Sequence, residues 1–205
     1  MTTKYGFSDV RGQLLESIKG AYPTKWEYFR TAKVLGEGIF GSPKPHPNAV
    51  LNLFMEQGIK FALPFAAYRA GMAGLSSLTS DKPGTVLPRL ALASIMHGME
   101  TIRGEVARLA YSAVCIVRLE DCRDEACAVN KAIKIPDKRL EMFNQIYDVM
   151  VRESKGGVLS SDISLGHIAC VRCAKTPEES YRFWRKVIWE GLPQTFRVGK
   201  SWEEV

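Results

Sequence analysis

Apolar residues recur at intervals of three or four along most of this 205-residue chain, and no segment shows the alternating pattern of a β-strand. The longest such run covers residues 87–113 and contains Leu90, Ile95, Met99, Ile102, Val106, Leu109 and Ala113. This spacing places the apolar side chains on one face of a helix. The pattern predicts an all-α fold in which residues 87–113 form a central core helix.

Prolines, glycines and capping residues mark further helices in the first half of the chain. Ser8 is an expected N-cap for a helix that Gly20 and Pro23 end. Pro47 fits the first turn of a second helix, because backbone N–H groups in the first turn have no partner within the helix and proline lacks this group. Gly58 is the expected C-terminal signal of this helix. Residues 61–72 are expected to form the next helix.

Two more helices are expected in the second half. Pro136 opens one whose core face would hold Leu140, Phe143, Ile146, Tyr147 and Met150. Thr176, Pro177 and Glu179 form a capping box with proline at the first helical position, so the last helix should begin there and stop near Gly191 and Pro193. No internal repeat is visible. We expect residues 1–205 to form one irregular helical unit, with a possible subdivision into residues 1–114 and 115–205.

The formal charge of +6 raises the question of nucleic-acid binding. Residues 1–121 hold 14 Lys and Arg against 10 Asp and Glu, and residues 122–205 hold 14 against 12. Nucleic-acid binders usually concentrate their basic residues in one patch or stripe, whereas this excess is diluted along the chain. A nucleic-acid-associated regulator is therefore the alternative hypothesis, with Lys131, Lys134, Lys138 and Arg139 as its basic residues.

The N-terminal residues MTTKYGFSDVRG lack the apolar stretch of a signal peptide, and no segment approaches the roughly 20 apolar residues of a membrane span. We expect an intracellular protein of the cytoplasm or nucleus, without a membrane partner. Reducing compartments disfavour disulfides, so the five cysteines are expected to be metal ligands or buried thiols.

Four of these cysteines form two close pairs, Cys122 with Cys127 and Cys170 with Cys173. C-x2-C is a frequent zinc-ligand spacing and C-x4-C lies at the loose end of the range. Forty-two residues separate the pairs, so the segment that contains the helix of Leu140 would have to leave the first pair and return to it before the two pairs could meet. The spacing is compatible with two interpretations of these cysteines, a structural zinc site and buried thiols without a metal. Cys115, at the end of the long helix, is expected to be a core residue.

Histidines and glycines supply no catalytic set. His167 lies three residues before Cys170, where it could replace one thiolate or support the site from outside the ligand shell. A cysteine nucleophile with His167 as its base is disfavoured, because neighbours along one chain rarely oppose each other in space. Gly36, Gly38 and Gly41 spell G-x-G-x-x-G, but prolines follow and no HRD or DFG motif occurs. We therefore predict that the chain is not an enzyme.

Several motifs occur in the order seen in a class of basidiomycete fungal proteins. TKYGFSDVRGQLLESIKGAYPT and HPNAVLNLFMEQGIKFALPFAAYRAG are followed by CRDEAC, CVRC, FWRKVIWEGLPQTF and SWEEV. The chain resembles, almost from end to end, the region that follows the BTB/POZ domain in fungal BTB-domain proteins. Each motif is loose by itself, and their order supports the resemblance.

The resemblance implies a non-enzymatic protein-interaction module, often of an adaptor, with a BACK-like helical front half and a cysteine-paired helical back half. Its partner would be a protein whose identity the sequence does not specify. The BTB fold, with its cullin-facing surface, would lie upstream of Thr3, so we do not expect cullin binding from this chain. Finding both cysteine pairs in family order favours zinc as the occupant of Cys122, Cys127, Cys170 and Cys173.

Overall fold

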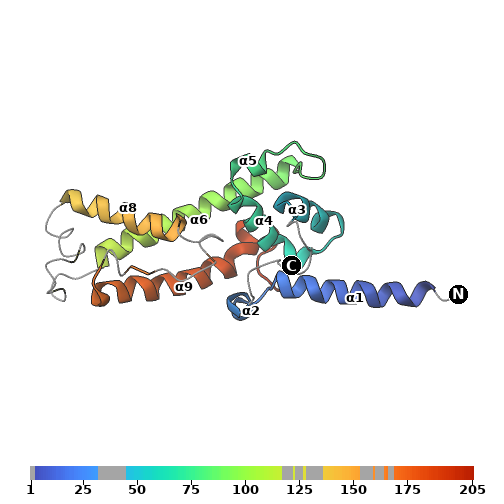
Figure 1. Cartoon of the computed structure of the whole chain (residues 1–205), viewed down its shortest axis with the longest axis horizontal. Helices are drawn as coiled ribbons and strands as arrows, with labels where there is room; N and C mark the ends of the chain where they lie inside the picture. Colours follow the sequence, from blue (N-terminus) through green and yellow to red (C-terminus); the bar gives the residue numbers. More distant parts are fainter. Residues whose placement is uncertain are drawn as a thin grey trace. The chain divides into compact units, whose positions relative to one another are not determined.

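The computed structural model describes residues 3–31, 45–116, 122, 127, 136–152, 159, 164–165 and 169–205, which form helices and no β-strand. The expected all-α class is confirmed. In chain order the elements are α1 (Thr3–Ala21), α2 (Trp26–Thr31), α3 (Pro47–Glu56), the 3-10 turn η1 (Lys60–Ala62), α4 (Leu63–Met72), α5 (Leu75–Leu78), α6 (Arg89–Ile116), α8 (Pro136–Arg152) and α9 (Val171–Thr195) (Figure 1). Among these helices, none combines the length and the apolarity that a membrane crossing requires.

The chain divides into two compact units. Unit 1 contains Met1–Met99 and Glu190–Val205, and unit 2 contains Glu100–Trp189. The boundaries fall inside α6 and α9, so each unit takes part of both helices. Unit 1 is therefore built from two separate stretches of sequence.

Proline and glycine signals predicted several helix ends correctly. Helix α3 begins at Pro47, and its C-cap, Gln57, is followed by Gly58 at φ +64°. This is the left-handed conformation that glycine adopts without steric penalty after a helix. Helix α8 begins at Pro136.

Three expected boundaries were wrong. Helix α1 begins at Thr3, so Ser8 lies inside it instead of capping it. Helix α9 begins at Val171, five residues before Thr176, and it continues through Gly191 and Pro193 to Thr195. The end of α9 is helical because Leu192, Pro193 and Phe196 are buried, and apolar burial outweighs the local helix-stopping preference.

An aromatic cluster forms the core of unit 1. Tyr22, the residue that directly follows α1, contacts Phe54 of α3 edge-on with a ring-centroid distance of 4.9 Å. Phe65 of α4 contacts Tyr22 at 5.9 Å and Phe29 of α2 at 5.5 Å. Since all four rings are buried, these contacts join the first four α-helices of unit 1.

Two asparagines one turn apart on α3 hold the segment that leads into α6. Asn48 is fully buried and donates from Nδ2 to the carbonyls of Ser77 (2.8 Å) and Thr85 (3.0 Å). Asn52 donates in the same way to the carbonyls of Gly84 (3.1 Å) and Val86 (2.9 Å). These four bonds satisfy one backbone carbonyl of α5 and three of the non-helical segment between α5 and α6, and they fix both against α3.

Helix α6 receives the C-terminal end of α9 within unit 1. Ser94 Oγ donates a hydrogen bond to the carbonyl of Phe196 at 2.5 Å. One turn later, a Cβ on Gly98 would lie 2.5 Å from Cε1 of the buried Phe196 ring. Glycine at position 98 therefore makes the space in which the aromatic ring packs.

Unit 2 is built from the second part of α6, α8 and the first part of α9. Ile102, Val106 and Leu109 of α6 are buried, as are Met142, Ile146, Val149 and Met150 of α8. Tyr181 of α9 donates from its hydroxyl to the carbonyl of Met150 at 3.4 Å, and Arg108 of α6 lies 5.0 Å from the ring centre of Trp184. Leu140, expected in the core, is 65% exposed because the buried face of α8 is rotated toward Met142.

We expect Gly98→Ala to lower the free energy of unfolding by about 1–3 kcal/mol, because its methyl group overpacks against Phe196. Gly104→Ala is a matched control in the same helix, since nothing lies within 4 Å of its Cβ position. That exposed substitution should stabilise the protein by up to about 1 kcal/mol through helix propensity. Urea denaturation measures both, and equal effects would contradict the packing at Gly98.

Candidate metal centre

The two cysteine pairs come from segments on either side of α8. Cys122 and Cys127 precede α8, whereas Cys170 and Cys173 lie at the start of α9. The carbonyl of Cys170 accepts a hydrogen bond from Ala174 N–H at 2.9 Å, which makes Cys170 the N-cap of this helix. The positive end of the helix dipole thus lies at the C-x2-C pair, and this favours thiolate ligands.

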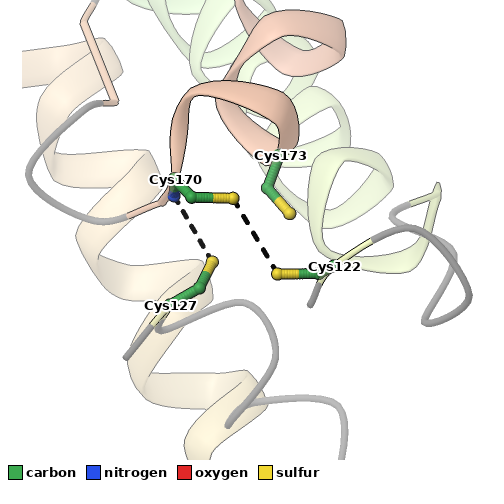
Figure 2. A group of neighbouring side chains, drawn as sticks. All are labelled: Cys122, Cys127, Cys170 and Cys173. Carbon is green, nitrogen blue, oxygen red and sulfur yellow. Dashed lines mark hydrogen bonds between the residues drawn. The ribbon is translucent and has the colours of Figure 1, made fainter. Parts of the chain in front are cut away.

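The four sulfur atoms converge on one small space, toward which all four side chains point (Figure 2). Every pair of Sγ atoms lies within 4.8 Å, and those of Cys122 and Cys170 are 3.8 Å apart. A tetrahedral thiolate site with metal–sulfur bonds of about 2.3 Å has sulfurs about 3.8 Å apart, whereas a disulfide needs about 2.05 Å. The four cysteines are free thiols at ligand spacing, and together they could hold a metal ion.

Burial makes ionisation of these thiols unfavourable, because the thiolate charges lose water and repel one another. Cys122, Cys127 and Cys173 are buried and Cys170 is half-buried. Burial raises the pKa of Cys173 well above its ordinary value, and the neighbouring thiols of Cys122, Cys170 and Cys127 raise it further. A cation that replaces the protons removes this conflict, because the thiolate charges then neutralise the ion.

A backbone hydrogen bond orients one of the sulfurs. The N–H of Cys170 points to Sγ of Cys127 at 3.4 Å, drawn as a dashed line in Figure 2. Such a donor spreads the charge of a metal-bound thiolate and fixes its direction. Because it joins the C-x2-C segment to the C-x4-C segment, the bond helps to hold the two pairs together.

The structure brings together the four cysteines that the spacing had singled out, with α8 lying between the pairs along the chain as expected. His167, the proposed substitute or supporting ligand, lies outside the described residues, and so do the glycine motif at residues 36–41 and two of the basic residues, Lys131 and Lys134. Lys138 pairs with Glu141 at 2.5 Å on the surface of α8, so this charge is already matched.

His46 has a structural role that the sequence analysis missed. Its Nδ1 accepts a hydrogen bond from Asn48 N–H at 3.3 Å and caps α3, while its Nε2 lies 3.1 Å from Ser77 Oγ. A neutral imidazole that accepts at Nδ1 carries its proton on Nε2, so His46 donates to the serine. It cannot act there as the base of a serine nucleophile, which would need a free lone pair on Nε2.

Comparisons of the chain with protein-family models, with curated proteins and with solved structures find no match. The candidate site is therefore defined by its own geometry.

We expect the metal-free protein to lose stability as the pH rises above the ordinary thiol pKa of about 8.5. The folded state holds the Cys173 proton more tightly than the unfolded state does, so only the unfolded state gains from ionisation at alkaline pH. Thermal unfolding in chelator at about pH 7.5 and about pH 9.5 measures the loss. Cys173→Ala should reduce this loss of stability between the two pH values. An unchanged pH dependence in that variant would contradict the raised pKa of Cys173.

Proposed function

We propose that this chain is a non-enzymatic protein-interaction module in which Cys122, Cys127, Cys170 and Cys173 hold a structural zinc ion. The observation that carries the metal part is the convergence of four sulfurs within 4.8 Å, with one pair at the 3.8 Å spacing of a tetrahedral thiolate site. Zinc suits this donor set because it accepts tetrahedral sulfur coordination without a redox change.

The ligand count supports a structural ion over a catalytic one. Catalytic zinc sites keep one coordination position open for water or substrate, and four protein ligands fill the tetrahedral shell. The bonds would connect residues 122–127 to the start of α9 across 42 intervening residues. Binding free energy would then stabilise the fold of unit 2.

Two further observations support the interaction role. His46, which lies beside Ser77, caps α3 and carries its ring proton on the nitrogen that faces the serine. Several large apolar side chains of unit 2 are also open to solvent, including Tyr111 (64% exposed), Leu140 (65%) and Phe183 (64%). The order of the motifs along the chain also supports a proposal for the origin of the chain. We propose that it derives from the region that follows the BTB/POZ domain in fungal proteins.

Metal analysis of the purified protein tests the zinc proposal directly. We expect one zinc per chain, removable with a strong chelator, and slow reaction of thiol reagents until the metal is removed. Iron in place of zinc would show as colour and in the elemental analysis. Protein that contains no metal after expression in zinc-supplemented medium, with four fully reactive thiols, would contradict the proposal.

Two serine substitutions separate a metal ligand from a packed thiol. Cys170 is half-buried, so Cys170→Ser by itself removes little packing, yet in zinc-loaded protein it should cost about 3 kcal/mol or more. Cys115→Ser removes the remaining cysteine of the chain and is the control. In chelator, the Cys170 variant and the parent should unfold nearly alike. Equal losses for both variants with zinc present would favour ordinary core packing.

Salt dependence separates a protein-interaction module from the nucleic-acid alternative. We expect no binding to labelled duplex DNA or single-stranded RNA in fluorescence anisotropy at low salt, because the basic residues are dispersed along the chain. Tight binding that weakens steeply as salt is added would overturn the proposal and establish phosphate contacts.

A further inference from the structure

Unit 1 contains an apolar groove that no part of the described chain fills. Its volume is about 370 Å³, and α3, α4, α6 and the residues after α9 line it. Its lining combines large side chains such as Leu51, Met55 and Leu63 with small ones such as Ala67. Small residues let a second backbone come close, and the large ones offer apolar contacts to its side chains.

Leu90 shows that the groove is part of a wider apolar surface. This residue of α6 lines the groove, yet it is 87% exposed, although its spacing had predicted a core position. A small molecule confined to the groove would leave most of Leu90 in water. A helix lying along the groove would cover the cavity and Leu90 together.

Arg197 adds charge to the same groove at a steric cost. Arg197 N–H bonds to the Gln194 carbonyl (3.0 Å) and Val198 N–H to the Pro193 carbonyl (2.8 Å), which is the pattern of a Schellman cap on α9. This cap places Arg197 at φ +57°, a conformation that glycine adopts more easily. The guanidinium of Arg197 makes no ion pair or hydrogen bond with any other described residue. The groove therefore offers a cation that no other described residue pairs, beside apolar walls.

Residues 9–17 of α1 have the complementary properties. Every described side chain from Asp9 to Ser17 is exposed except that of Leu15, which is half-buried. Val10 is 63% and Leu14 is 53% exposed, and these positions lie on one face of the helix, one turn apart. Asp9, next to Val10, has a carboxylate without a partner among the other described residues. An exposed apolar helix face thus lies beside an anion that is unpaired within the described part of the chain.

We propose that the apolar groove of unit 1 binds residues 9–17 of α1 from a second copy of this chain, with Val10 and Leu14 in the groove and Asp9 toward Arg197. If each copy inserts its helix into the other, the two contacts are related by a two-fold axis and form a closed dimer. The contact is of the helix-in-groove kind. It does not depend on the zinc proposal, because the groove and α1 lie in unit 1 and the cysteines in unit 2.

Light scattering coupled to gel filtration, over a concentration series from low to high micromolar, tests the exchange. We expect the parent protein to dimerise, and Leu14→Glu and Leu90→Glu each to weaken the dimer at least about tenfold, because each removes an apolar contact from both interfaces. Both residues are more than half exposed, so neither substitution should prevent folding. Gln13→Glu adds the same charge beside Leu14, and Met96→Glu removes an exposed apolar residue of α6 outside the groove; both should dimerise like the parent.

Mixing the two weakened variants identifies the contact. The Leu14→Glu copy keeps an intact groove and the Leu90→Glu copy keeps an intact helix, so the mixture should form a heterodimer through one contact. A parent protein that is monomeric throughout would overturn the proposal. So would a loss in only one variant, since that result indicates contact between two α1 helices or between two grooves.

Arg197→Gly separates binding from folding. Glycine relieves the left-handed strain, so the variant should be at least as stable to urea as the parent. Its dimer should nevertheless be about five- to tenfold weaker, because the partner of Asp9 is lost at both interfaces. An unchanged dimer affinity would overturn the role of the arginine.

Discussion

The close approach of four sulfur atoms sets the conditions under which unit 2 is stable. Four thiolates within 4.8 Å of one another, three of them buried, would repel strongly, and burial together with the neighbouring thiols raises the pKa of Cys173, which favours its protonated form in the metal-free site. Protonated thiols attract each other only weakly, as in the 3.8 Å contact of Cys122 with Cys170. A cation at the centre would remove the repulsion between thiolates, and it would make the ligand-bearing segments and the start of α9 mutually dependent.

The start of α9 shows why strong local signals can mislead. Thr176, Pro177 and Glu179 satisfy the pattern of a capping box, whose contribution is about 1 kcal/mol. Pro177 has no N–H, so the helical bond to the Cys173 carbonyl cannot form. The helix nevertheless begins six residues earlier than Pro177, because its first turn brings Cys173 to the other sulfurs and buries Ala174. Tertiary contacts decided this boundary, and they are invisible to a local pattern.

The same distinction separates what could be predicted of the site from what could not. The all-α class and the four cysteines were visible in the sequence, because apolar periodicity and thiol chemistry are local properties. The groove was not, since residues 51–67, 90–95 and 196–198 come together only in the fold. Periodicity also predicted core positions for Leu90 and Leu140, which are exposed. A repeat of three or four residues identifies a helix but does not say how far its apolar face is covered.

Leu90 and Arg197 each break a local rule, and both line the same groove. An exposed leucine alone means little, because folded proteins leave much apolar surface in water. A left-handed arginine alone costs about 1–2 kcal/mol, which a stable cap can offset. At one location, however, the two departures supply what a binding groove needs, an apolar contact and a charge that selects its ligand. Departures from local preference tend to gather where function requires them, and the exposed helix face beside Asp9 has the matching chemistry.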